Sequence, residues 1–540
     1  MQIDLEQSGL PSSFHSTVCI IGGGIAGLIL ATRLAGRGID VHLLEAGGLI
    51  PEERSQALYR SEIAAERHMG VHEGRFRTFG GTSTQWGGQL LPFTHDTFVA
   101  PKGSATLGWP IAEQELTPYY DDIQRLLGVD QLPFTADLLP ALGHPAVAFP
   151  SDIRLRFSKW IPFNRRNLAR TIGQEALAHP KITVFTHANA AFFKRDSSDP
   201  SRIASVQVLN YERREFTFTA SQFVVCAGTI ESCRLLLCSP DVPNPHDQIG
   251  RYFHDHISFH AARFLSPARE RIVEQLGPFF VDGTLHTCKL EAMPELRERE
   301  NLLAVMSHVV IEEPEDSGVA AIRNLLRSLQ SGRLKEAIVA NLLPTIRGAA
   351  DVARLLFYTR FKKRRAISSR ATLYLNVDLE QVPNPDNRIR LSDRTDALGL
   401  PVTVVDWRIG DLEKDTAYRF SQIMRGHLQS MGLDPGAWDP ALAEGVTPPM
   451  SDIIHAMGGL RMGDDPASSV VNRDLTVHGL DNLAIASCAV FPSGSSSNPT
   501  FTMMALTLRL ADRLTAQFAA TRPATISEQG SRAESLAPAN

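Results

Sequence analysis

Two strand–glycine–helix units and a long stretch of alternating residues predict an α/β protein. We expect a Rossmann-like domain and a second, α+β part with an antiparallel sheet and helices. The first unit, TVCIIGGGIAGLILATRLAGRGIDVHLLEAGG, spans residues 17–48, and the second, QFVVCAGTIESCRLLLCS, spans 222–239. The alternating stretch is ATLYLNVDLEQVPNPDNRIRLSD at 371–393, followed by LPVTVVDWRI at 400–409. A chain of 540 residues is long enough for two or more domains.

The composition is that of an ordinary globular chain. It is 43% hydrophobic and 21% charged with a net charge of −5, so the overall charge does not indicate a nucleic-acid partner. No apolar run is long enough for a membrane span, and the start, MQIDLEQSGLPSSFHS, contains no export signal. The six cysteines form no CxxC pair, which indicates reduced thiols rather than a disulfide or zinc framework. We therefore expect a cytoplasmic protein.

The first unit has the spacing of a dinucleotide-binding turn. Thr17–Ile21 is an apolar, β-branched run typical of a buried strand, and Gly22, Gly24 and Gly27 follow in GxGxxG spacing. These glycines permit a tight turn, the approach of a pyrophosphate and close helix–strand packing. Glu45 ends the second strand, where it can accept both ribose hydroxyls and would repel the extra phosphate of NADP. The turn alone leaves FAD and NAD open.

A second glycine-rich element, RFRTFGGTSTQWGGQLLPF, occupies residues 75–93. Glycine, serine and threonine are frequent in turns, so a surface loop is one interpretation. However, the element also contains Phe76, Phe79 and Trp86, which favour burial. A buried glycine-rich loop must satisfy its backbone groups, and a flat polar ring bound against the main chain is one partner that can do so.

These elements resemble the glucose–methanol–choline (GMC) oxidoreductase family of FAD enzymes. The resemblance also rests on the unit at 222–239 and on residues 455–514, HAMGGLRMGDDPASSVVNRDLTVHGLDNLAIASCAVFPSGSSSNPTFTMMALTLRLADRL. It covers both ends of the chain and part of its middle, and it implies FAD rather than NAD. The sugar-oxidising branch, which includes pyranose oxidase, has a comparable Gly-Gly-x-Ser-Thr-x-Trp loop, so we expect that branch to be the nearest.

The resemblance also implies which residues hold the cofactor. The GGTST loop would lie against the isoalloxazine ring, and the backbone near Asn189 would lie beside the adenine. Several family members link the flavin to a histidine that is Gln85 here, so we expect non-covalent FAD, with attachment through His72 or His95 as the alternative. The expected FAD contacts are Gly22, Gly24, Gly27, Glu45, Gly80, Gly81, Thr82, Ser83, Thr84, Trp86, Gly87, Ala190, Ser487, Pro499 and Thr500.

Alcohol oxidation requires a base for the hydroxyl proton and a group that holds the oxygen, while flavin N5 accepts the hydride. Neutral imidazole suits the first task and an amide donor suits the second. By resemblance, His455 occupies the position of the base and Asn498 that of its hydrogen-bond partner. The alternative is that both are structural, with His455 bonded to a backbone carbonyl and Asn498 beginning a turn.

Other histidines have weaker signals. His254 and His256 have the HxH spacing of a metal site on a strand, but no further ligand cluster accompanies them in the sequence. The family has a comparable segment near the flavin without metal, so we expect structural or pocket-lining roles and no bound metal. His478 is expected in a turn.

The resemblance implies an FAD-binding domain assembled from both ends of the chain, and we expect the alternating strands of 371–409 to roof the isoalloxazine. The expected segments are 1–93 (FAD-binding, first part), 94–165 (connecting, substrate cap), 166–251 (FAD-binding, second part), 252–450 (substrate-binding), 451–519 (FAD-binding, with the catalytic residues) and 520–540 (disordered tail).

Residues 317–370 form a basic insertion in the substrate-binding segment. They are rich in Lys and Arg, their only acidic residues are Glu336 and Asp351, and apolar residues recur at helical spacing. We expect two or three amphipathic helices, broken near Pro344. Such helices can dock an acidic partner or a membrane surface, or they can pack on their own domain.

The resemblance implies an FAD-dependent enzyme that oxidises an alcohol group of a sugar, glycoside or related polyol. O2 or a quinone-type compound would be the electron acceptor. The main alternative is a hydrophobic secondary alcohol such as a steroid or terpenoid, which would require a pocket of apolar residues from 265–310 and 340–375. An electron-transfer subunit with a protein partner and non-redox lyase chemistry are further alternatives.

Overall fold

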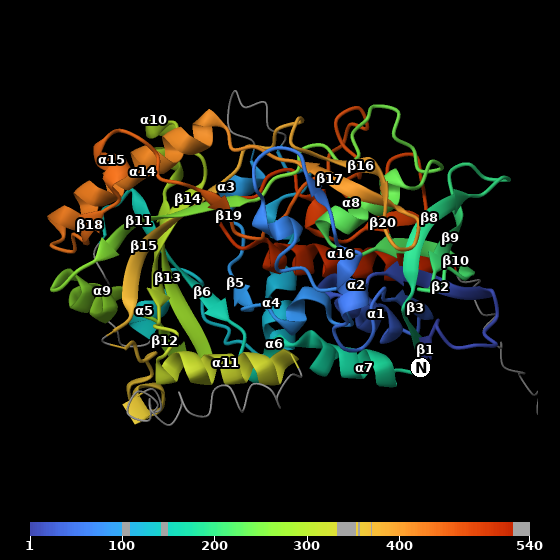
Figure 1. Cartoon of the computed structure of the whole chain (residues 1–540), viewed down its shortest axis with the longest axis horizontal. Coiled ribbons are helices and arrows are strands. Elements are labelled where there is room, and N and C mark those ends of the chain that lie inside the picture. Colours follow the sequence, from blue (N-terminus) through green and yellow to red (C-terminus); the bar gives the residue numbers. More distant parts are fainter. Residues whose placement is uncertain (100–107, 142–148, 332–352, 355–356, 369, 522–540) are drawn as a thin grey trace, which may run out of the picture.

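The computed structural model describes residues 1–99, 108–141, 149–331, 353–354, 357–368 and 370–521. Two large sheets lie side by side, and Figure 1 shows the antiparallel sheet on the left and the Rossmann-like sheet on the right. A third, small sheet lies beside the Rossmann-like one. The expected α/β class with an antiparallel substrate sheet is therefore confirmed.

The Rossmann-like sheet has eight strands. Its parallel core has the order β1-β7-β3-β2-β10, strand β20 also pairs parallel with β10, and β9 and β8 extend it antiparallel. Central strands such as β2 and β3 are apolar and buried on both faces, as a parallel sheet between helices requires. The strands are β1 (Gln2–Asp4), β2 (Ser13–Ile21), β3 (Val41–Leu44), β7 (Ile182–Thr186), β8 (Asn189–Arg195), β9 (Ile203–Leu209), β10 (Glu215–Val225) and β20 (Leu483–Ile485).

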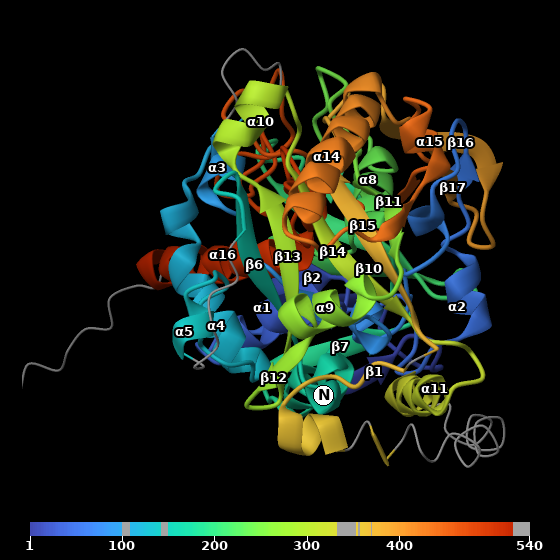
Figure 2. The same ribbon diagram turned by 90° about the vertical axis from the view of Figure 1, so that its left-hand side faces the viewer.

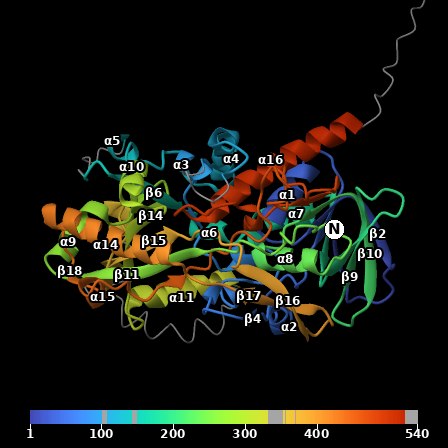
Figure 3. The same ribbon diagram turned by 90° about the horizontal axis from the view of Figure 1, so that it is seen from above.

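Helices from both ends of the chain pack beside this sheet. The C-terminal helix α16 lies along α1 and α4, and Figure 3 shows it crossing over α1. Strand β20 and helix α16 complete a domain that begins at β1, so this domain is discontinuous in sequence. The helices are α1 (Ile25–Ala35), α4 (Thr117–Leu127), α7 (Ile172–Ala178), α8 (Thr229–Leu237) and α16 (Pro499–Thr521).

The second sheet has nine strands, all antiparallel, in the order β18-β11-β15-β14-β13-β6-β5, with β12 and β19 at its margins. Figure 2 shows helices α9, α10 and α14 over its outer face. The strands are β5 (Gln89–Leu90), β6 (Ile153–Trp160), β11 (His256–Phe264), β12 (Phe279–Val281), β13 (Thr284–Ala292), β14 (Val305–Glu312), β15 (Thr372–Glu380), β18 (Gly436–Trp438) and β19 (Ser451–Asp452). The outer helices are α9 (Ala268–Leu276), α10 (Pro294–Glu300), α14 (Asp411–Ser430) and α15 (Pro440–Ala443).

The hairpin that follows β15 corrects one expectation. Strands β16 (Arg388–Thr395) and β17 (Pro401–Asp406) do not join the nine-stranded sheet but form a three-stranded sheet with β4 (Glu62–Ile63). They pack on α8, beside the Rossmann-like domain. The Asn-Pro-Asp-Asn turn at 384–387 redirects the chain, because proline and asparagine break the ladder at this point.

The connecting segment 94–165 and the first segment 1–93 both contribute to the nine-stranded sheet, through β6 and β5 respectively. The shorter helices are α2 (Glu53–Ala57), α3 (His95–Phe98), α5 (Leu138–Ala141), α6 (Phe163–Arg166), η1 (Met69–Val71), η2 (Gly81–Thr84), η3 (Glu113–Glu115), η4 (Leu168–Arg170) and η6 (Cys488–Val490).

The basic insertion begins as the helix α11 (Gly318–Ser331), as expected, and ends with the π-helical turn η5 (Tyr358–Lys362). The expected break near Pro344 lies outside the described residues, as does most of the expected tail, because α16 continues to Thr521. Among the residues that the structure describes, no helix combines the length and the apolar character needed to cross a membrane.

Candidate active site

An elongated cleft follows the carboxyl ends of the Rossmann-like strands. It consists of two adjoining cavities of about 1090 and 670 Å³ that share Gly22, Glu45 and Tyr59 in their walls. The larger cavity extends to His455, and the smaller one extends to Asp396. A long ligand with one end near His455 and the other near Asp396 therefore matches its shape.

The GxGxxG turn is built as its spacing predicts. Gly22 has φ +110°, and a Cβ there would lie 2.6 Å from the carbonyl oxygen of Cys226. A Cβ on Gly27 would lie 1.9 Å from the carbonyl oxygen of Gly22. Gly24 caps α1 and lines the larger cavity with Ile25 and Ala26, and a Cβ on it would lie 3.9 Å from Cα of Gly81. The first N–H groups of the helix therefore border this cavity, where a phosphate can bind them.

Glu45 is buried and lines both cavities. Its carboxylate accepts hydrogen bonds from the backbone N–H of Gly23 (3.0 Å) and of Gly47 (2.8 Å), and burial raises its pKa. It therefore braces the glycine turn in addition to the ribose contact expected for it.

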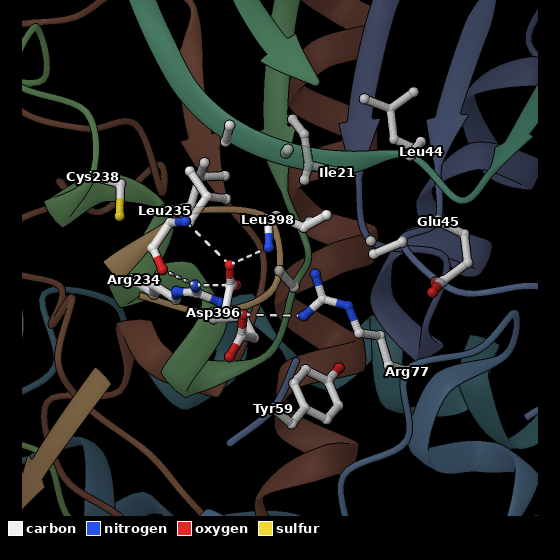
Figure 4. A pocket seen from close by; sticks show the side chains of 18 residues that line it. Ile21, Leu44, Glu45, Tyr59, Arg77, Arg234, Leu235, Cys238, Asp396 and Leu398 are labelled. Atoms are coloured by element: carbon white, nitrogen blue, oxygen red, sulfur yellow. Dashed lines mark hydrogen bonds and ion pairs between the residues drawn. The ribbon is translucent and has the colours of Figure 1, made fainter. Parts of the chain in front are cut away.

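The smaller cavity contains charged residues that the sequence analysis did not single out (Figure 4). Glu231 on α8 pairs with Arg75 (2.9 Å) and Arg77 (3.4 Å), and Arg77 also donates to Asn189 (3.1 Å). Among the described residues, the buried Nε atom of Arg77 has no hydrogen-bond partner, so its N–H can donate to a ligand. Arg75 and Arg77 stand just before the glycines of the second element, and this RxR pattern was the available signal.

The second glycine-rich element forms the short helix η2. Gly81 and Thr82 line the larger cavity. In contrast, the hydroxyls of Ser83 and Thr84 donate to the carbonyls of Gly80 (2.6 Å) and Gly81 (2.9 Å), so they shape the turn. The loop thus presents mainly backbone to the cleft, as expected for contact with a flat ring.

Trp86 and Gly87 anchor this loop. The indole N–H of Trp86 donates to the carbonyl of Arg166 (2.7 Å), and a Cβ on Gly87 would lie 2.8 Å from the ring of Trp160. Both residues thus fasten the loop to its neighbours. Gln85, directly before Trp86, is exposed.

Four further expected contacts border the cleft. Pro499 and Thr500, in the first turn of α16, line the larger cavity, and Ala190 on β8 lines the smaller one. Ser487 also lines the larger cavity, and its side chain accepts from the N–H of Ala489 (3.2 Å), which caps η6.

His455 and Asn498 come together at the far end of the larger cavity. The amide of Asn498 donates to Nε2 of His455 (3.3 Å), and both residues are only half-buried. Nδ1 of His455 meets Nδ1 of the buried His256 at 3.0 Å. Burial and then the neighbouring His256 lower the pKa of His455 to about 4, so the imidazole is neutral at physiological pH and can accept a proton.

Asp255 connects the segment of the base to the substrate sheet. Its Oδ1 accepts the backbone N–H of His256 (2.7 Å) and of His455 (2.9 Å). On its other side, Asp255 faces His68, which lies between it (3.3 Å) and Asp452 (3.5 Å). Burial alone would raise the pKa of Asp255, but the hydrogen bond and charge of His68 lower it.

His68, Asp255 and Asp452 hold ligand-type atoms within 4.8 Å of one another. The two ring nitrogens of His68 face different carboxylates, so the ring lies between Asp255 and Asp452. A metal ion could use only one of these nitrogens.

Comparison with known proteins agrees with this geometry. The GMC oxidoreductase family model matches residues 383–507, and the FAD dependent oxidoreductase model matches 17–252. The chain is 30% identical to 2-methyl-1,2-propanediol dehydrogenase of Mycolicibacterium austroafricanum (94% of this chain, 96% of the relative). It is 23% identical to the fructose dehydrogenase large subunit of Gluconobacter japonicus (93% and 98%).

The crystal structure of pyridoxine 4-oxidase from Mesorbium loti has the same fold, with a TM-score of 0.56 and 17% identity over 92% of this chain and 99% of that one. The glycine turn, Glu45 and the Nε–H of Arg77, which has no hydrogen-bond partner among the described residues, fit an FAD molecule in the cleft. The chain therefore belongs to the GMC oxidoreductase family and is an FAD-dependent enzyme that oxidises alcohol groups.

Proposed function

We propose that the substrate is a sugar, glycoside or related polyol, with His455 as the base and Asn498 as its hydrogen-bond partner. The observation that carries this proposal is the chemistry of the nine-stranded sheet. Along β15, the polar residues Asn376, Asp378 and Glu380 alternate with the apolar residues Leu375, Val377 and Leu379. One face of the sheet is therefore polar and the other apolar.

The polar face is the one that meets the catalytic pair. His256 on β11 contacts His455, and Glu380 accepts the backbone N–H groups of Gly494 and Ser495 (both 3.1 Å), just before Asn498. The registers of the neighbouring strands extend this face. Its polar side chains are Arg154, Arg156, Ser158, His256, Ser258, Thr287, Lys289, Glu291, His308, Asn376, Asp378 and Glu380.

Lys289, on β13, is the lysine of this polar face. Its side chain is buried, and within the described residues its Nζ has no hydrogen-bond or ion-pair partner. Burial lowers its pKa to about 8, and the charge of Asp378 acts against this shift. A buried ammonium requires acceptors, and substrate hydroxyls can supply them.

Asp378 provides acceptors beside this donor. Its Oδ1 receives hydrogen bonds from Ser258 and Asn376 (both 2.7 Å), and its Oδ2 lies 3.3 Å from Nδ1 of His308. Hydroxyl groups both donate and accept, so adjacent hydroxyls of a polyol match a surface that mixes ammonium, carboxylate, amide and hydroxyl groups. A steroid or terpenoid would leave these groups unpaired, at a cost in binding.

The apolar face of the sheet points away from the catalytic pair and is covered by α14, which packs on β15. A hydrophobic substrate would need apolar residues of 265–310 in its pocket. On β13 these include Cys288 and Leu290, which alternate with the polar-face residues and therefore lie on the opposite, apolar face. Part of the other segment, 340–375, lies outside the described residues. This arrangement favours the polyol over the hydrophobic alcohol.

FAD, when bound, supplies the acceptor for the hydrogen and the electrons of the alcohol carbon. His455 has its Nε2 at the cleft and takes the hydroxyl proton there. Asn498 holds the substrate oxygen, because its amide can donate to the oxygen once His455 takes the proton. Among the described residues, the buried Oδ1 of Asn498 has no hydrogen-bond partner, which leaves it available to the substrate.

We infer that the FAD is non-covalent, and the residues near the loop support this. Gln85 cannot form the histidyl link. His72 is held by the carbonyl of Ser61 at 2.9 Å, and His95 lies in the exposed first turn of α3. Neither histidine lines the two cavities.

The electron acceptor is O2 or a quinone-type compound. A role as an electron-transfer subunit has one supporting observation, since a relative is named as a large subunit. The basic segment 317–370 would be the docking surface in that case.

The test is anaerobic reduction of the bound flavin, followed by its absorbance, in wild type and His455→Ala. The panel contains D-fructose, other monosaccharides, glycosides, 2-methyl-1,2-propanediol and sterols. We expect a sugar, glycoside or polyol to bleach wild-type flavin. The variant should retain FAD and react about 100- to 10,000-fold more slowly. Bleaching by sterols alone would overturn the substrate class, and equal rates in both proteins would overturn the role of His455.

A further inference from the structure

His256 and the carbonyl of Gly494 form a hydrogen-bonded chain that ends on the base. Nε2 of His256 lies 3.0 Å from the Gly494 carbonyl oxygen, and Nδ1 of His256 lies 3.0 Å from Nδ1 of His455. The two rings are nearly perpendicular, with an interplanar angle of 86°. His256 is 1% exposed, so water cannot replace either partner.

The protons of these hydrogen bonds can be assigned from the Gly494 end, because only one donor is possible there. A carbonyl oxygen accepts but never donates, so Nε2 of His256 must carry a proton. A neutral His256 then has a lone pair on Nδ1, and the proton between the two rings must belong to Nδ1 of His455. This leaves Nε2 of His455 without a proton, facing Asn498 and the cleft.

The contact between His455 and Asn498, at the other end of these hydrogen bonds, independently requires the same protonation of His455. Asn498 places its amide nitrogen, a donor, 3.3 Å from Nε2 of His455, and that contact also needs a lone pair on Nε2. We propose that His256 is a positioning residue that fixes the tautomer and the ring orientation of His455, so that the nitrogen facing the substrate is always the basic one. This inference rests on the role of His455 proposed above.

Without His256, the neutral ring of His455 could carry its proton on either nitrogen. The tautomer with the proton on Nε2 cannot take a proton from substrate at that atom. Asp255 already holds the backbone N–H groups of both histidines. The side chain of His256 is therefore needed to fix which nitrogen of His455 carries the proton, and not to hold the backbone in place. Rotation of the imidazole about its own bond is restricted by the same contact.

The test compares His256→Leu and His256→Asn with wild type, by anaerobic flavin reduction across pH. Leucine removes the acceptor, whereas asparagine keeps an oxygen near the position of Nδ1. We expect His256→Leu to slow reduction about 10- to 100-fold, as is typical when a group that orients a functional histidine is removed. His256→Asn should recover part of the rate, with FAD content and substrate KM unchanged in both variants.

His254→Leu is the matched control. His254 lies two residues away, is equally buried, and donates to the carbonyl of Tyr252 (2.8 Å) without touching His455. The pH profile is a second readout, because a neutral His256 that accepts a hydrogen bond from Nδ1 of His455 favours the protonated form of the base. Its loss should move the acid limb of the profile to lower pH. The charges of Asp255, Asp378 and Lys289, which also act on His455, stay in place.

A double-variant cycle separates positioning from general damage. In a His455→Ala background, His256→Leu should have no further effect on the rate, because the residue it orients is absent. Equal additional loss in both backgrounds, or loss in His254→Leu as large as in His256→Leu, would overturn the inference. If His455→Ala reacts as fast as wild type, the role of His455 as the base is wrong. This outcome is distinguishable from one that contradicts only the positioning role of His256.

Discussion

Arg234 and Asp396 form a buried ion pair, with 2.6 Å between Nη2 and Oδ2, that ties helix α8 to the turn between β16 and β17 (Figure 4). The Nε–H of Arg234 also donates to the carbonyl of Pro401 (2.7 Å). Oδ1 of Asp396 accepts the N–H groups of Leu398 (2.8 Å) and Leu400 (3.1 Å), which closes the turn. All of these residues except Pro401 line the smaller cavity, at the expected adenine end.

Removing this pair should weaken FAD binding without touching the chemistry. Breaking a buried pair by removing one partner leaves an uncompensated charge. We expect Asp396→Asn to raise the Kd of FAD by roughly 10- to 100-fold, which corresponds to about 1.4–2.7 kcal/mol. Titration of apoprotein with FAD, followed by fluorescence, measures this change. Arg394→Met is the control, because Arg394 pairs with Glu62 on the exposed side of the same hairpin, and its Kd should equal that of wild type.

Asn498 should contribute to the rate more than to FAD binding. Loss of one donor to a developing oxyanion costs about 100- to 1000-fold in kcat. We expect a loss of this order in Asn498→Ala, and a smaller one in Asn498→His, which retains a ring donor. Stopped-flow flavin reduction is the measurement, and FAD content should remain that of wild type. A change in KM alone would mean that Asn498 only binds substrate.

Lys289 predicts a pH dependence of substrate binding. Its pKa of about 8 means that the ammonium is present below pH 8 and is lost as pH rises through that value. Because the charged form offers more donors to substrate hydroxyls, KM should rise between pH 7 and pH 9. In Lys289→Met, KM should be raised about tenfold already at pH 7, with no further rise linked to this group. A wild-type KM that stays constant up to pH 9 would contradict the assignment.

The sequence predicted the parts of this site that depend on local backbone geometry. Gly22, Gly24 and Gly27 are recognisable because close approach and a positive φ leave few alternatives, and His455 and Asn498 are recognisable because they stand in a long family motif. His455 and Asn498 also come together in space, as the motif implied.

Residues whose roles depend on tertiary pairing were not predictable in this way. Arg234 and Asp396 are far apart in sequence, and nothing local indicates that they meet. The hairpin of β16 and β17 has the same alternation as β15 but joins another sheet, because alternation identifies a strand without identifying its partner. His256 carried only an HxH pattern, and its contact with His455 requires the fold.

His42 predicts that the protein loses stability in mild acid. It lies on β3 against the rings of Phe14, Phe185 and Phe218. Its buried Nδ1 has no hydrogen-bond partner among the described residues. Burial lowers its pKa from 6.5 to about 4. Between about pH 4 and pH 6.5, the unfolded chain therefore binds a proton at His42 that the folded protein does not bind. The contribution is fully present above pH 6.5 and is lost as pH falls toward 4.

The linked loss of unfolding free energy between pH 7 and pH 5 is about 1–2 kcal/mol for this group. His42→Phe cannot be protonated, so its unfolding midpoint in urea should fall less than that of wild type over the same range. The comparison uses the change with pH in each protein, so any packing cost of the larger ring cancels. His246→Phe, at an exposed position whose charge does not act on His42, is the control and should follow wild type. Equal acid losses in His42→Phe and wild type would show that another group, such as His254 or His308, carries the sensitivity.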